Sequence, residues 1–262
     1  ELINKIPTPT LNVPTLFLIR SRPNEGEKLF SEEWQISYNS RNPEKINPGR
    51  FNGPREPMFY ACIAGEKSKT NDFRLTSCLE SDKSVLSESN TKPVQYFTSG
   101  VWRLKKPLNV INLCNNEQLM IANPKMKGKI NTFIKNIYNT FPSASAPFII
   151  EFWEFICGLA AKKDEIGCEH FLSTAYSTAI FAYYREVMKK ELHGIIYPSP
   201  VTNNYGINLV LKPQVVDDSL SLKSVYMIKF ERDKSNLKGY NIGICSKEVP
   251  VVNGKFELTI DY

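Results

Sequence analysis

The stretch from Gly49 to Tyr60 constrains the fold of this chain most strongly, because it joins turn-forming residues to the start of an apolar segment. The residues at 49–50 and 52–54 favour turns, since glycine adopts backbone angles that other residues avoid and proline fixes its own. Residues 57–63 are short and apolar, which predicts a buried strand. We therefore expect a basic, amide-rich loop that leads into the core. Such a loop suits an anionic ligand, and a solvated surface loop is the alternative.

The rest of the chain mixes short apolar runs with longer stretches of helical period. Strands are expected at 15–19, 57–63, 94–104, 108–113, 194–197, 206–211, 225–230, 240–245 and 255–260. Helices are expected at 74–80, 131–141, 148–162 and 167–190. The two kinds of element do not alternate regularly as they do in βαβ folds, so the pattern predicts an α+β fold.

Two of the expected helices are rich in apolar residues, and we expect both to contribute to the core. The helix at 148–162 is apolar on most sides, which predicts burial. The helix at 167–190 repeats apolar residues with a helical period, and this stripe is expected to face the core rather than a cofactor. The stripe comprises Phe171, Leu172, Ala175, Tyr176, Ala179, Ile180, Tyr183, Tyr184 and Val187.

With 262 residues, the chain is long enough for one large domain. Residues 1–14 are polar and rich in proline, which predicts an N-terminal arm or linker. Residues 15–262 are expected to form a single domain, with a helical elaboration at about 123–190 and a strand-rich extension at about 212–262. Because the chain begins with Glu1 rather than methionine, we interpret it as a fragment or a trimmed chain.

Composition narrows the classes of function. The six cysteines form no CxxC pair and the chain has two histidines, so neither a disulfide framework nor a metal site is expected, and a cytoplasmic compartment fits best. No apolar run reaches the roughly 18–20 residues of a membrane helix. The net charge of +6 suits an anionic small ligand or nucleic acid. Nucleic acid is the less expected partner, because no aromatic residues interleave the lysines Lys125, Lys127, Lys129 and Lys135.

The chain contains no P-loop, GxGxxG, GxSxG or HExxH motif. No histidine is nominated as a partner for Ser199, so a serine hydrolase is disfavoured. The remaining candidates are polar residues near short apolar segments: Arg20, Arg50, Asn52, Tyr60, Glu80 and Ser199. They supply arginines for a diphosphate, an aromatic ring for stacking, one carboxylate and one hydroxyl. This set suits a nucleotide with a glycosidic bond.

Five segments, in this order, resemble the RES-domain family of toxins, which is named after its arginine, glutamate and serine. They lie at 18–22, 49–52, 58–61, 76–80 and 194–199, the last followed by 206–211. They resemble in turn the strand-end arginine motif, the Gly-Arg-aromatic-Asn loop, the strand with a tyrosine, the short helix with the glutamate, and the serine motif with its following strand. Order and spacing add weight to the individual matches, which span residues 16–211.

The resemblance implies a fold related to ADP-ribosyltransferases, with a central split β-sheet and an inserted helical region. It also implies cleavage of NAD at the nicotinamide–ribose bond, with NAD as substrate and no further cofactor. By resemblance, Arg20 and Arg50 would bind the diphosphate, and Tyr60 would position the nicotinamide half. Glu80 would stabilise the ribosyl cation or orient the acceptor, and Ser199 would hydrogen-bond the ribose or the phosphates. An antitoxin or immunity protein is the implied partner.

Two further positions belong to the expected site, because Asn52 and Asn208 lie in the matching segments and are expected to contact NAD. The segment before the expected glutamate is longer and more polar than in the family, which leaves Glu66 as the alternative. Pro200 replaces the small residue and arginine that often follow the serine, so one phosphate contact is missing. The acceptor stays open between water and phosphate, that is, between an NAD glycohydrolase and an NAD phosphorylase. Two other functions stay open, namely ADP-ribosyl transfer to a macromolecule and a non-catalytic nucleic-acid-binding module.

Overall fold

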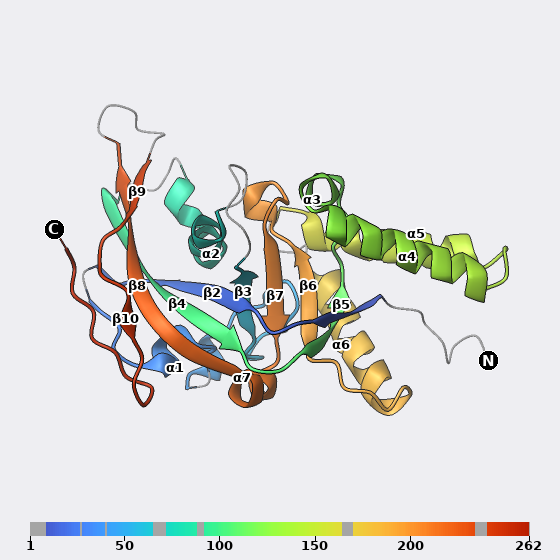
Figure 1. Ribbon diagram of the computed structural model, residues 1–262, viewed down its shortest axis with the longest axis horizontal. Coiled ribbons are helices and arrows are strands. Elements are labelled where there is room, and N and C mark those ends of the chain that lie inside the picture. Colours follow the sequence, from blue (N-terminus) through green and yellow to red (C-terminus); the bar gives the residue numbers. More distant parts are fainter. Residues whose placement is uncertain are drawn as a thin grey trace. The chain divides into compact units, whose positions relative to one another are not determined.

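The computed structural model describes residues 9–26, 28–39, 41–64, 72–87, 92–163, 170–233 and 240–261. The chain forms two compact units, each assembled from segments that are distant in sequence (Figure 1). The predicted α+β class is confirmed, because each unit combines strands with helices. Unit 1 comprises Glu1–Pro14, Ser40–Met58 and Pro107–Lys212, and unit 2 comprises Thr15–Asn39, Phe59–Lys106 and Pro213–Tyr262.

Unit 2 is built on an antiparallel sheet in which β2 pairs with β3 on one side and with β4 on the other. The second edge of β4 pairs with β8, and both β9 and β10 pair with β8. The helix α7 (Pro213–Ser219) leads directly into β8. The strands are β2 (Phe17–Pro23), β3 (Phe59–Ile63), β4 (Val94–Leu104), β8 (Leu220–Arg232), β9 (Tyr240–Ile244) and β10 (Val249–Pro250).

One face of this sheet carries large buried rings under the short helix α1 (Glu33–Ile36). The rings of Phe59 and Trp102 meet edge to face, with their centroids 5.1 Å apart. A Cβ added at Gly100 would lie 2.9 Å from the Trp102 indole nitrogen and 3.0 Å from the Ile36 side chain. A side chain at this position would therefore displace the Trp102 ring or the ends of the neighbouring Leu222 and Ile36 side chains.

The opposite face is covered by α2 (Phe73–Ser81), as Figure 1 shows. This helix begins after Asp72, whose carboxylate accepts hydrogen bonds from two backbone N–H groups of the first turn. Its Ser77 hydroxyl donates to the carbonyl of Ile19 at 3.2 Å, which fixes the helix on β2. The predicted helix at 74–80 is confirmed. A 3-10 turn, η3 (Lys83–Leu86), follows it.

Unit 1 contains a second, mixed sheet. β1 pairs antiparallel with β5, β5 pairs parallel with β6, and β6 pairs antiparallel with β7. Residues 10–13, expected in an N-terminal arm, thus form strand β1 on β5. β6 is buried along its whole length, as expected for a central strand. The strands are β1 (Thr10–Val13), β5 (Leu108–Asn112), β6 (Gly194–Pro198) and β7 (Ile207–Leu211).

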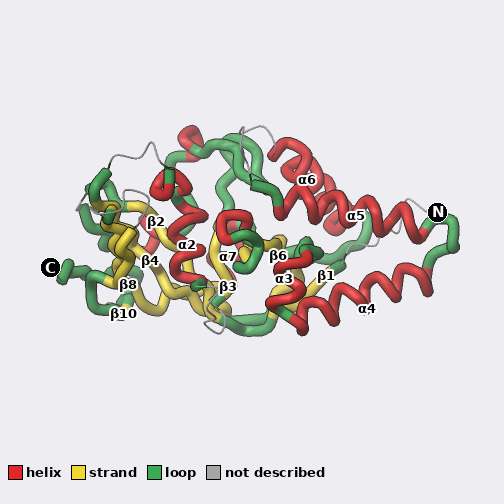
Figure 2. Tube along the Cα trace, turned by 90° about the horizontal axis from the view of Figure 1, so that it is seen from above, coloured by secondary structure: helices red, strands yellow, loops and turns green. Residues whose placement is uncertain are grey.

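The helices of unit 1 include an antiparallel hairpin of α4 and α5, which Figure 2 shows side by side. The hairpin is held by Phe133 and Trp153, whose ring centroids are 4.8 Å apart, and by Ile137 and Ile150. The helix expected at 131–141 begins earlier, because Asn123 caps α4 through its side chain. The elements are η2 (Pro43–Lys45), α3 (Glu117–Ala122), α4 (Pro124–Thr140), α5 (Ala146–Ala161), α6 (His170–Glu186) and η4 (Pro200–Thr202).

The prediction that the helix at 148–162 is buried on most sides is wrong. In α5, Trp153 and Ile156 are buried, but Phe148, Phe152 and Phe155 are 73%, 52% and 53% exposed. A helix of this composition carries more apolar residues than one packed face can cover. The sequence therefore predicts the helix correctly, but the prediction overestimates how much of its surface is buried.

The predicted core stripe of α6 is also largely wrong. Phe171 and Leu172 are 78% and 50% exposed, and Ile180 and Tyr184 are the buried members of the stripe. The rest of the buried face consists of serine residues at 173 and 177. These serines face inward because their hydroxyls donate hydrogen bonds to backbone carbonyls of the loop at 49–53.

A strand expected at 255–260 is absent from the described residues. Lys255 forms isolated bridges with Glu32 and Val252, and the residues that follow belong to no strand. Phe256 and Leu258 are buried, so their alternation reflects burial without a hydrogen-bonded ladder. The other expected strands correspond to β2 to β9 of the structure.

Gly194 in β6 provides a test of the packing in unit 1. A Cβ at this position would lie 2.0 Å from the carbonyl oxygen of Val210, so Gly194→Ala forces the two strands apart. We expect it to lower the free energy of unfolding by about 1–3 kcal/mol. Gly158→Ala in α5 is the control, because its Cβ would meet no atom within 4 Å. That change should raise stability by about 0.5–1 kcal/mol.

Denaturant unfolding of both alanine variants measures the difference. Equal stability of Gly194→Ala and the unsubstituted protein would contradict the close approach of β6 and β7.

Candidate functional site

The loop at 49–53 of unit 1 contains two of the predicted site residues, Arg50 and Asn52. The N–H of Gly49 donates to the carbonyl of Asn52 at 3.0 Å, which closes a tight turn. The Asn52 amide donates to the carbonyls of Gly53 and Asn47 at 2.9 and 3.3 Å, and the residue is 4% exposed. Asn52 therefore shapes the loop that presents Arg50.

Three hydroxyl groups of α6 hold this loop. Ser173, Thr174 and Ser177 donate hydrogen bonds to the carbonyls of residues 50, 49 and 51 at 2.6, 3.2 and 3.2 Å, respectively. Buried carbonyls require donors, and a loop without a ladder strand must find them elsewhere. Sequence reasoning missed these residues. The signal that could have found them is the spacing of hydroxyl residues at i, i+1 and i+4 within an apolar helix.

Arg50 is the most deeply buried arginine of the expected site, with 7% of its surface exposed. Its guanidinium donates to the carbonyl of Leu159, in the last turn of α5, at 2.9 Å. Among the residues that the structure describes, no carboxylate forms an ion pair with it. The carbonyl end of a helix favours a cation but does not neutralise it. A buried guanidinium in this state is suited to bind an anion.

Ser199 and Asn208 lie on the hairpin of β6 and β7 in the same unit. Ser199 is fully buried, and its N–H donates to the carbonyl of Gly206 at 2.8 Å. Asn208 is 3% exposed and is the ladder partner of Tyr197. The ring of Tyr197 meets that of Phe51 edge to face, with 5.0 Å between the centroids. The hairpin and the loop at 49–53 therefore pack together.

Arg20 lies in β2 of unit 2 and is held by backbone carbonyls. Its guanidinium donates to Tyr60 at 2.6 Å and to Ser37 at 3.3 Å, and it lies 5.3 Å from the centroid of the Phe59 ring. Burial, and then the neighbouring charge of Arg22, lower the pKa of Arg20 to about 10. The group remains a cation at neutral pH. No described carboxylate forms an ion pair with it.

Tyr60 and Glu80 lie on the other side of this sheet from Arg20. Arg20 packs on Phe59, and successive side chains of β3 point to opposite faces. Cys62 shares the face of Tyr60, and burial, followed by the charge of Glu80, raises its pKa well above the usual range. Glu80 on α2 is therefore near the Tyr60 face of β3. The hydrogen bond of Arg20 goes to the backbone carbonyl of Tyr60, and the charge of the Tyr60 phenol has a smaller effect that raises the pKa of Arg20.

The structure thus groups the predicted residues by unit. Unit 1 brings the loop of Arg50 and Asn52 together with the hairpin of Ser199 and Asn208. The other three predicted residues, Arg20, Tyr60 and Glu80, belong to unit 2. Glu66, the alternative glutamate, lies outside the described residues.

The described part of the chain shows no sign of a metal site. No group of three or more histidine, cysteine or acidic side chains gathers there as potential metal ligands. None of the described helices is long and apolar enough to cross a bilayer. The free cysteines of the described residues are all buried, and they are Cys62, Cys78, Cys114, Cys157 and Cys245.

The bond from Ser173 to the Arg50 carbonyl can be tested by substitution. We expect Ser173→Ala to lower the free energy of unfolding by about 1–3 kcal/mol, because a buried carbonyl loses its donor. Thr178→Ala, on the exposed side of the same helix, is the matched control and should change stability by about 0.5 kcal/mol or less. Thermal or denaturant unfolding measures both. Equal effects of the two substitutions would show that α6 does not hold the loop through this hydroxyl.

Comparison with known proteins adds no relative to this description. No family model matches the chain, and no curated protein is significantly similar to it.

Proposed function

We propose that this chain binds NAD and cleaves its nicotinamide–ribose bond, as the resemblance to RES-domain toxins implies. In this proposal the fold is related to that of ADP-ribosyltransferases. NAD carries a diphosphate, two riboses and a cationic nicotinamide ring. The residues at the matching positions provide cations, amides, hydroxyls and one carboxylate for these groups.

The observation that carries the proposal is the burial of Arg50 without a carboxylate partner among the described residues. Its guanidinium is buried, has a carbonyl rather than a carboxylate as its described partner, and is presented by a loop fixed through three hydroxyl groups. Removing a cation from water without a counter-ion is unfavourable, so a structure that does so favours an anionic ligand. Arg20 of unit 2 is held in the same manner by two carbonyls. A diphosphate provides the negative charge that the carbonyl partners of these guanidinium groups lack.

The chemistry follows from the weak bond between the ribose and nicotinamide. When the bond from C1′ to the ring nitrogen breaks, its electron pair goes to the nitrogen and neutralises the ring. The ribose becomes oxocarbenium-like, and a carboxylate near it stabilises the positive charge. Glu80 serves this role. Water then attacks C1′ and releases a proton, which yields nicotinamide, ADP-ribose and a proton.

In this proposal Tyr60 positions the nicotinamide half, and Ser199 and Asn208 provide polar contacts to the substrate. Asn52, expected to contact NAD, acts instead through the loop that presents Arg50. The reaction requires no additional cofactor in this scheme. The protein acts in the cytoplasm, where NAD is abundant, and an antitoxin or immunity protein restrains it. If a side chain or a nucleic acid attacks C1′ in place of water, the same residues perform ADP-ribosyl transfer.

The proposal predicts that the purified protein releases nicotinamide from NAD. We expect Glu80→Gln to lower kcat by about 10²-fold or more, because the substitution removes a charge that acts in the transition state. We expect Arg50→Gln to lower kcat/KM by about tenfold or more through lost diphosphate binding. Chromatography of nicotinamide and ADP-ribose over time measures both effects. Labelled NAD shows whether the ribosyl group is instead transferred to a macromolecule.

Arg55→Gln is the matched control for Arg50→Gln. Arg55 belongs to the same region, but its side chain is 72% exposed and pairs with Glu44 at 3.1 Å. This control should retain full activity. Turnover that is unchanged in both Glu80→Gln and Arg50→Gln would overturn the site assignment, and a folded protein that leaves NAD intact would overturn the function.

A further inference from the structure

A hollow lies in unit 2, on the face of the sheet that α2 covers. Its volume is about 430 Å³, within the roughly 300–1,000 Å³ range of small-molecule sites. Its wall is mainly apolar and includes Phe17, Ile19 and Phe73. None of the residues assigned to NAD lines it. Three polar side chains, Arg74, Tyr226 and Glu248, complete the lining and indicate what it binds.

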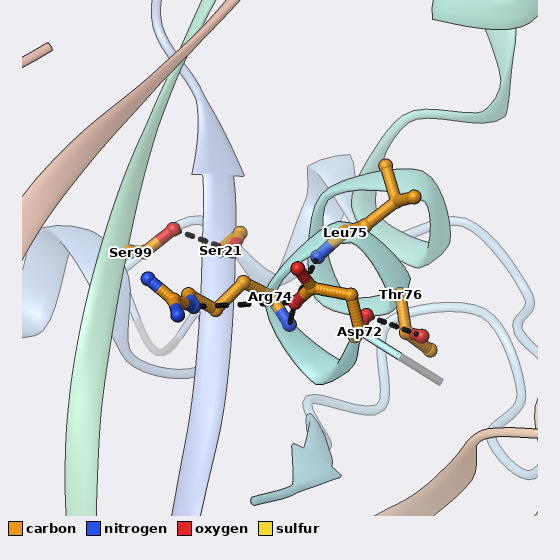
Figure 3. A network of polar contacts seen from close by, with 6 residues as sticks. All are labelled: Ser21, Asp72, Arg74, Leu75, Thr76 and Ser99. Atoms are coloured by element: carbon orange, nitrogen blue, oxygen red, sulfur yellow. Dashed lines mark hydrogen bonds and ion pairs between the residues drawn. The ribbon is translucent and has the colours of Figure 1, made fainter. Parts of the chain in front are cut away.

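Tyr226 contributes a buried hydroxyl that has no hydrogen-bond partner among the described residues. The residue is 4% exposed and is the ladder partner of Ser99, whose hydroxyl lies 2.7 Å from that of Ser21 on the same face (Figure 3). Burial raises the pKa of this phenol, so it stays protonated and can donate. A buried donor without an acceptor is unfavourable, and a ligand acceptor removes that penalty.

Arg74 supplies a second set of donors to the same hollow. Figure 3 shows it at the start of α2, with its guanidinium turned toward β2 and β4. Its side chain is 22% exposed, and its one ion pair among the described residues is to Asp72, at 3.9 Å. That distance is longer than a hydrogen bond, and half-exposed pairs of this kind are weak. The planar group, near the ring of Phe73 at 5.8 Å, therefore keeps donors for an anion.

Glu248 limits the charge that this hollow accepts. Its carboxylate accepts a hydrogen bond from the Ser224 hydroxyl, and the residue is exposed at the rim. A ligand with several negative charges, such as a phosphate ester, would place one of them toward this carboxylate. A single carboxylate satisfies Arg74 without that repulsion, and the apolar wall favours a ligand whose remaining atoms are hydrophobic.

We propose that this pocket binds a small amphipathic monocarboxylate. The carboxylate accepts hydrogen bonds from the Arg74 guanidinium and the Tyr226 hydroxyl. An aromatic or branched aliphatic body packs against Phe17, Ile19 and Phe73. This site uses none of the residues assigned to NAD, so it stands or fails independently of the proposed enzymatic activity.

The test is calorimetric titration of the full chain with phenylacetate and with 4-methylpentanoate. The neutral amide of each acid serves as the matched ligand control. We expect at least one acid to bind with a dissociation constant of about 1 mM or tighter. Its amide should bind about tenfold more weakly, because the charge-assisted hydrogen bonds are lost. If neither acid binds the folded protein, or if acid and amide bind equally, the proposal is wrong.

Two substitutions locate the binding. Arg74→Gln should weaken binding of the acid about tenfold or more, and Arg185→Gln, at an exposed arginine of α6, should leave it unchanged. Tyr226→Phe should weaken binding and yet raise the melting temperature of the free protein, since it removes an unpaired buried hydroxyl. Tyr138→Phe, at an exposed tyrosine of α4, is its control.

Unchanged affinity in Arg74→Gln, with its fold confirmed by circular dichroism, would exclude this pocket as the binding site. A lower melting temperature for Tyr226→Phe would show that the hydroxyl has a partner in the free protein, which would also overturn the proposal.

Discussion

The hydrogen bonds from α6 to the loop at 49–53 are the interactions on which the proposed activity most depends. The loop belongs to no strand apart from an isolated bridge between Gly49 and Asn52, so its inner carbonyls need donors. The hydroxyls of Ser173, Thr174 and Ser177 provide them. This arrangement fixes the backbone of Arg50 and allows its guanidinium to be buried at the end of α5. The position of a charged group is thereby determined by neutral hydrogen bonds.

Both arginines that the resemblance nominates are held in a similar way. Arg50 donates to the carbonyl of Leu159, and Arg20 donates to those of Tyr60 and Ser37. Carbonyl oxygens orient a guanidinium and offset part of the cost of burial without neutralising its charge. A carboxylate partner would occupy the donors that a ligand needs. This shared geometry is the physical argument that connects the sequence resemblance to anion binding.

Most elements of the fold could be predicted from the sequence, because helices such as α2 have an apolar period and strands such as β4 are rich in β-branched and aromatic residues. The surfaces of α5 and α6 could not. In α5, apolar residues surround the helix, so periodicity does not distinguish the buried Trp153 from the exposed Phe152. In α6, the packed face is chosen by the carbonyls of a loop more than 100 residues earlier, and no local pattern encodes that need.

The roles of the site residues stay predictions, and the structure shows only where their side chains lie. The order of the matching segments along the chain nominated Arg50 and Ser199, and both residues are buried in unit 1. It did not indicate that Asn52 is engaged in shaping its own loop, or that Arg20 and Tyr60 point to opposite faces of a sheet. The face to which a side chain points depends on the register of its strand, and sequence motifs alone do not define that register.

The central claim is that Arg50 is buried in order to bind an anionic part of the substrate. Titration of ADP-ribose into the full chain tests it most directly, because binding is measured without any assumption about turnover. We expect the unsubstituted protein to bind ADP-ribose, Arg50→Gln to bind it about tenfold or more weakly, and Arg55→Gln to bind it with unchanged affinity. Equal affinity of ADP-ribose for Arg50→Gln and the unsubstituted protein would contradict it.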